Sequence, residues 1–221
     1  MGLEVISLIL TSAASYDLVQ LADVHAYQGI PPTDTTQDTF IAGAISRVSA
    51  AIQTYCGRNF VVEGRSDTFY PERSDYPWQL PGNIRKLNLT SWPVINVGSV
   101  QIFFDQASPQ TLTASTDFLI DPTRGQLVRM DAMLNIPSVW DTVQTVVQYT
   151  AGYATIPLDI QDACLRMISS SMKGRGRDPM LKAIEQAGVR QEYWIDASGN
   201  KGNFPPDITE ILDFYRVPVA R

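Results

Sequence analysis

Hydrophobic residues follow a helical period near the N-terminus, an alternating period in the middle of the chain and a helical period again toward the C-terminus. The clearest helix is expected over 40–57, where apolar residues recur every three or four positions. Gly57 is suited to end it, because glycine readily adopts the left-handed backbone found just after many helices. A shorter helix is expected within 15–30 and is stopped by Gly29.

The stretch from about 60 to 150 predicts strands, since apolar and polar residues alternate along its segments. Turn-forming sequences rich in Pro, Gly and Asp separate the candidate strands. The six segments that suit a strand are 60–70, 83–89, 97–104, 117–121, 126–130 and 142–149. This pattern is typical of a small antiparallel β module.

Helical spacing returns at 156–174, where Pro157 is tolerated because the first residues of a helix need no N–H partner. Further helices are expected over 178–188 and, as a short amphipathic helix, within 205–217. The predicted fold class is therefore α+β: a small helical bundle with an inserted antiparallel β module and extended N- and C-terminal arms.

The expected parts of the chain follow from these changes of period. They are an N-terminal arm with a short helix (1–38), a helical core (39–59 and 151–187), the inserted β module (60–150) and a C-terminal arm with a short amphipathic helix (188–221).

Composition limits the kinds of function open to the chain. Among 221 residues, 17 are basic and 23 acidic, for a net charge of −6, whereas dedicated nucleic-acid-binding proteins are usually basic. His25 is the only histidine, which excludes sites with two His ligands, and no P-loop, dinucleotide-binding, HExxH or CxxC motif occurs. We therefore expect no enzyme, no cofactor and no metal site. His25 is expected at a surface or a subunit interface, and Cys56 and Cys164 as small core residues.

No apolar run reaches the roughly 18 to 20 residues that a membrane helix needs. No Lys or Arg precedes Arg47, so the positive region of a secretory signal is also missing. We expect a soluble protein made in the cytosol, without a membrane partner.

Charge is unevenly distributed along the chain. Residues 1–39 contain five carboxylates and no Lys or Arg, whereas 166–182 is predominantly basic. Opposite charges of this kind could attract each other between neighbouring copies, or could simply be two solvated faces. The candidate subunit-interface residues are Arg166, Lys173, Arg175, Arg177 and Lys182 on the basic side and Asp17, Asp34 and Asp38 on the acidic side.

Several stretches, taken in order, resemble a known family. They are YDLVQLADVHAYQGI, AISRVSAAIQTYCGRNF, LTSWPVINVGSVQIFFD, VVQYTAGYATIPLDIQDACLRMI and the ending ILDFYRV. A helix that ends in a Y-x-G-R-like turn leads into the β module, and a Y-T-A-G-Y-like turn leaves it for a helix that opens P-x-D-I-x-x-A. In this order the chain resembles the head–tail connector (adaptor) proteins of tailed bacteriophages and phage-like gene-transfer particles. The Pro-rich loop at 71–82 departs from the family pattern by its length.

The resemblance implies a structural virion protein at the head–tail junction, made in the host cytoplasm. Such proteins form a ring of about twelve copies beneath the portal, in which each copy meets its neighbours through two different faces. The ring extends the DNA channel, contacts the portal above and the stopper or tail protein below, and lets DNA pass without specific recognition. No catalysis is implied.

The C-terminal segment carries an apolar face on a helix too short to be stable alone. It therefore packs either on its own subunit or in a groove of the portal or a neighbouring copy. The candidate docking residues are Phe204, Ile208, Ile211, Leu212, Phe214, Tyr215 and Arg216.

Three alternatives to a connector stay open at this point. The chain could be a tail-completion or stopper protein of the same neck. It could be a small carboxylate- or metal-dependent hydrolase, whose mark would be two or three carboxylates converging in a cleft. It could also be a generic β-module binding protein.

Overall fold

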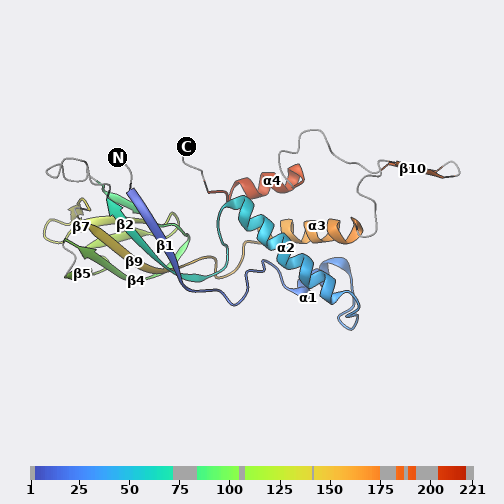
Figure 1. Ribbon diagram of the computed structural model, residues 1–221, viewed down its shortest axis with the longest axis horizontal. Helices are drawn as coiled ribbons and strands as arrows, with labels where there is room; N and C mark the ends of the chain where they lie inside the picture. Colours follow the sequence, from blue (N-terminus) through green and yellow to red (C-terminus); the bar gives the residue numbers. More distant parts are fainter. Residues whose placement is uncertain are drawn as a thin grey trace. The chain divides into compact units, whose positions relative to one another are not determined.

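The computed structural model describes residues 3–71, 84–104, 108–140, 142–174, 183–186, 189–192 and 204–217. The chain divides into two compact units (Figure 1). The β unit comprises residues 1–15 and 59–155, and the helical unit comprises residues 16–58 and 156–221. Within the described residues the helices and the antiparallel sheets confirm the α+β class.

The β unit contains a five-stranded and a four-stranded sheet, both antiparallel in every strand pair. The larger sheet has the order β1 (Leu3–Thr11), β2 (Glu63–Pro71), β9 (Gln144–Ala151), β4 (Val94–Phe103) and β5 (Pro109–Leu112). The smaller has β3 (Lys86–Asn88), β7 (Gln126–Asp131) and β6 (Phe118–Asp121), with β8 (Ile136–Pro137) paired to β7. All six predicted strand segments are confirmed, whereas β1, β5 and β8 were not predicted as strands.

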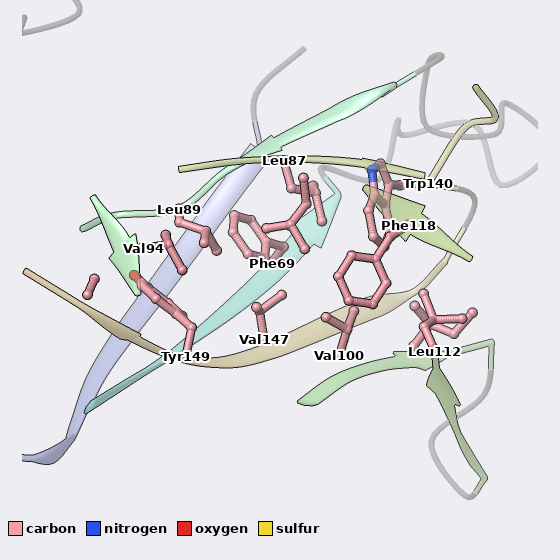
Figure 2. Packing of buried hydrophobic residues seen from close by; sticks show 13 residues of the cluster. Phe69, Leu87, Leu89, Val94, Val100, Leu112, Phe118, Trp140, Val147 and Tyr149 are labelled. Carbon is pink, nitrogen blue, oxygen red and sulfur yellow. The ribbon is translucent and has the colours of Figure 1, made fainter. Parts of the chain in front are cut away.

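Side chains from both sheets meet in one hydrophobic core (Figure 2). The larger sheet contributes Phe69, Val100, Ile102, Val147 and Tyr149, and the smaller contributes Leu87, Phe118 and Leu127. Alternation explains this arrangement, because every second residue of a strand faces the same side. On β9, for example, Thr145, Val147 and Tyr149 are buried while Gln148 is exposed.

The helical unit is built around one long helix, α2 (Asp38–Cys56), which contacts the other three. These are α1 (Leu21–Gln28), α3 (Leu158–Gly174) and α4 (Pro206–Asp213). Gly29 and Gly57 end α1 and α2 with φ angles of 69° and 67°, which confirms both predicted stops. Leu158–Gly174 likewise confirms the helix predicted over 156–174.

Two helix predictions are corrected by the structure. The helix expected within 15–30 occupies only Leu21–Gln28, because the Asp23 carboxylate accepts the Gln20 N–H (2.8 Å) and caps the helix at Gln20. The helix predicted over 178–188 is wrong: β10 (Ala183–Gln186) pairs with β11 (Val189–Glu192) in an antiparallel hairpin. The two residues between these strands include a glycine, which is a signal for a hairpin. The surrounding residues have high helix propensity, and for this reason a helix was predicted instead.

Two segments expected as arms belong to the compact units. Residues 3–11 form β1 of the larger sheet, and α4 contacts α2 and α3. None of the helices in the described ranges is long and apolar enough to cross a bilayer.

Candidate interaction surfaces

The basic candidates gather in part at the C-terminal half of α3. Arg166, Lys173 and the exposed Tyr27 of α1 line an open pocket of about 460 Å³ together with Ser169 and Ser170. Arg166 is already paired, since its guanidinium lies 2.7 Å from Asp162 and 3.5 Å from Asp207. The hydrogen bond to Asp162 is the main reason that the pKa of Arg166 is raised. Lys173 is exposed and is the better candidate for an ion pair with another molecule.

Arg175, Arg177 and Lys182 lie outside the described residues, so the structure brings together only two of the five basic candidates.

The acidic candidates differ in how available they are. Asp34 lies on an exposed turn, where the Thr36 hydroxyl and N–H both donate to its carboxylate and lower its pKa. Asp17 is exposed as well. Asp38, in contrast, is half-buried and lies 2.8 Å from the Nε2 atom of His25. Asp34 and Asp17 are therefore exposed at the surface, whereas Asp38 contacts His25 inside its own subunit.

His25 does not lie at a free surface, which corrects the prediction for this residue. Its side chain is buried and links α1, to which it belongs, to the start of α2 through the hydrogen bond with Asp38. A hollow of about 360 Å³, lined by apolar side chains of α1 and of residues 29–32, opens beside the pair. Within the described ranges no group of three or more His, Cys, Asp and Glu side chains is placed to hold a metal ion.

The C-terminal docking candidates divide into an inner and an outer set. Phe204, Ile208 and Leu212 are buried in the helical unit, where the Phe204 ring packs edge-on against Tyr55 at 5.2 Å. The sequence could not distinguish packing on the same subunit from docking on a partner. The structure shows that these three side chains pack within their own subunit.

The outer set is held close to the helical unit but faces outward. The Tyr215 hydroxyl donates to Asp159 (2.7 Å), and the Val217 N–H donates to the Cys56 carbonyl (2.9 Å). Ile211 is half-buried, Arg216 is exposed and Phe214 is 86% exposed. A fixed segment that presents a phenylalanine to solvent is suited to contact a partner.

Strand β1 is a surface that the sequence reasoning missed. Ile6, Leu8, Ile9 and Leu10 are all exposed, and among the described residues the strand pairs on one side only, with β2. The signal was present in the sequence, because residues 5–10 are an uncharged and almost wholly apolar run. It was interpreted as part of an extended arm, although such a run fits a strand at the edge of a sheet.

A buried polar network anchors β1 and its neighbours. The fully buried Asp67 carboxylate accepts hydrogen bonds from the Tyr149 hydroxyl (2.7 Å) and from the N–H and hydroxyl of Thr90 (2.8 and 2.9 Å). Thr90 in turn lies 2.9 Å from the Ser7 hydroxyl of β1. Burial raises the pKa of Tyr149. The network stabilises the sheet and offers no nucleophile to a substrate.

The two thiols are chemically quiet. Cys56 and Cys164 are free and fully buried, which confirms their prediction as core residues. Burial raises the pKa of Cys56 to about 11 and that of Cys164 to about 12. Because the thiolate is the reactive form, neither cysteine is suited to nucleophilic catalysis.

Comparison with known proteins identifies the family to which the chain is similar. A family model described as head completion protein matches residues 17–217. The fold resembles a chain in the neck of an empty gene transfer agent particle computed with C6 symmetry (TM-score 0.54, 14% identity, covering 100% of this chain and 98% of that one). It also resembles a chain in the virion of a native gene transfer agent particle (TM-score 0.55, 14% identity, covering 97% of each). No curated protein gives a significant match.

The family match covers nearly the whole chain and confirms the predicted resemblance to structural head–tail proteins. It also confirms the expectation of a structural virion protein rather than an enzyme. At 14% identity, the two solved structures add that the fold is the same. This chain belongs to the head completion protein family.

Proposed function

We propose that this protein is a connector of the virion neck, in which about twelve copies form a ring that joins the portal of the DNA-filled head to the tail and extends the DNA channel. The family match over residues 17–217 carries the proposal. The likeness in fold to a chain of a gene transfer agent neck computed with C6 symmetry supports it, because proteins of such a neck are present in several copies around one axis.

The ring needs a contact between two different faces of the subunit. We place one face at the pocket beside Lys173 and the other at the exposed carboxylates of Asp17 and Asp34 on the neighbouring copy. Opposite charges at these places would favour association and set its orientation. Arg175, Arg177 and Lys182 lie outside the described residues and stay candidates for a subunit interface by their charge alone.

Contacts with the portal above and the stopper or tail protein below use other surfaces. Of the C-terminal docking candidates, Phe214 and Arg216 stay exposed, and we assign them to the portal or an adjacent copy. DNA passes through the channel without specific recognition, which suits a chain of net charge −6, because acidic walls repel the phosphate backbone.

Native mass spectrometry of the purified full chain, alone and mixed with portal rings, tests this function. The expected species is a ring of about twelve copies, or a monomer that becomes such a ring on the portal. A protein that stays monomeric in both samples would contradict the proposal. So would a monomer that hydrolyses a substrate in the presence of a divalent cation, since a connector needs no chemistry.

A further inference from the structure

The two edges of the five-stranded sheet are protected very differently. Edge strand β5 is four residues long and begins with Pro109, and short strands with proline are a usual way to prevent pairing with another chain. The opposite edge strand, β1, is nine residues long and contains no Pro, Lys or Arg. Its backbone N–H and C=O groups on the open side therefore form an unguarded template for a further strand.

Strand β1 is also held rigidly while its apolar side chains are exposed. Val5 packs against the core of the β unit, and the Ser7 hydroxyl lies 2.9 Å from that of Thr90. Ile6 and Leu8 alternate with these residues and point to the other face, where Leu8 is 60% exposed. An open edge with an apolar outer face is costly in water unless a partner covers it.

The helical unit contains a two-stranded hairpin, β10–β11, that has no third strand to pair with among the described residues. Hairpin β10–β11 pairs only with itself among the described residues, in the register Ala183↔Glu192 to Gln186↔Val189. A two-stranded hairpin is marginally stable in water and needs a third strand or a packing surface.

We propose that hairpin β10–β11 of one copy adds to the open edge of β1 in a second copy, which continues the five-stranded sheet across the subunit boundary. Strand addition of this kind gains affinity from backbone hydrogen bonds and covers apolar side chains at the same time. Each copy gives its hairpin to one neighbour and receives a hairpin from another, so the contact is heterologous and can close a ring. The inference rests on the proposed ring and names one of its interfaces.

A lysine in β1 tests the edge directly. In Leu8→Lys an exposed side chain becomes charged, which leaves the isolated subunit folded but opposes strand addition. The matched control is Leu134→Lys, because Leu134 is 66% exposed but lies in the turn between β7 and β8. We expect ring formation to fall about tenfold or more for Leu8→Lys and to stay at the wild-type level for the control, with equal thermal melting of both subunits.

Disulfide trapping identifies the occupant of the edge. One full-length chain carries Leu8→Cys, and a second carries a single cysteine at each position of 189–192 in turn; the native Cys56 and Cys164 are buried and do not compete. We expect at least one position to give a covalent dimer between the two chains in assembled rings. A chain carrying both cysteines, diluted with wild type, shows whether the bond forms within one copy instead.

The outcomes distinguish a failure of the strand exchange from a failure of the proposed ring. If wild-type protein assembles while Leu8→Lys assembles equally well and no position of 189–192 cross-links to another chain, the strand exchange is wrong and the ring stands. Cross-links formed only within one chain would also overturn the exchange. If wild-type protein forms no ring with or without portal, the proposed function fails, and the exchange fails with it.

Discussion

At the scale of single residues, the β unit depends on a buried carboxylate that its neighbours keep hydrogen-bonded. Asp67 is fully buried and accepts from the Tyr149 hydroxyl at 2.7 Å. Tyr149→Phe removes that donor, and leaving a buried charged group short of a partner costs about 1–3 kcal/mol of unfolding free energy. Urea unfolding measures the loss, and Tyr70→Phe, which changes a half-buried tyrosine of β2, serves as the control. A Tyr149→Phe loss no larger than that of the control would contradict the importance of the network.

The buried thiols make stability depend on alkaline pH. In the folded protein burial raises the pKa of Cys56 to about 11 and that of Cys164 to about 12, from an ordinary value near 9. The unfolded chain therefore loses these protons first, so the thiols contribute stability in full below pH 9 and lose it as pH rises toward 11–12. We expect the urea midpoint to fall over this range, and less steeply in a variant with both cysteines changed to alanine. An identical fall in both proteins would contradict the assignment.

At the scale of elements, periodicity was enough to predict most of the fold. The long helix over 40–57 and the six internal strands could be read from the sequence because one face of each is buried and the other is solvated. Strand β5 could not be predicted, since Pro109 and its polar neighbours are typical of a turn and join the sheet only through pairing with β4. The hairpin at 183–192 was missed because local helix propensity does not register strand pairing.

The turn that leaves the β unit requires a glycine. Gly152 has a φ of +127°, and a Cβ atom there would lie 2.4 Å from the Val61 carbonyl oxygen, in the backbone itself. Gly152→Ala is expected to lower the free energy of unfolding by about 2–4 kcal/mol, because both strain and a clash are introduced. In Gly98→Ala the new atom would meet the Gln148 carbonyl at an ordinary 3.5 Å, so this control should lose far less. Equal melting temperatures for the two variants would refute the explanation.

At the scale of the whole molecule, the candidate interface residues were the least predictable part. Charge alone suggested Asp38 and Arg166, yet both are paired within their own subunit. Likewise, Phe204, Ile208 and Leu212 were docking candidates because a sequence shows an apolar face without showing what covers it. Lys173, Asp34 and Phe214 were candidates on the same grounds, and only the fold shows that their side chains are exposed.

Charge reversal tests the electrostatic contact between copies. Lys173→Glu and Asp34→Lys should each weaken ring formation several-fold at low salt, because each places like charges together. The double variant should recover much of the loss, and the differences should shrink as salt screens the charges. Ring yields measured by native mass spectrometry at low and high salt check this. Assembly that is insensitive both to salt and to the single changes would rule out the contact.

Attachment to the portal is tested at Phe214. Because this side chain is 86% exposed, Phe214→Asp should leave the melting temperature unchanged while it weakens binding to portal rings about tenfold or more. Met133→Asp is the control, since Met133 is 95% exposed in the β unit. Portal binding measured by sedimentation would contradict the assignment if both variants bound as wild type does.

The central claim is that this protein works as a structural connector in the neck of a virion. Electron microscopy of purified particles that carry a tagged copy of the chain tests it most directly. The account predicts density for the tag in a ring at the junction of head and tail, repeated around the particle axis. Particles that bear both head and tail but carry no tag at that junction would contradict it.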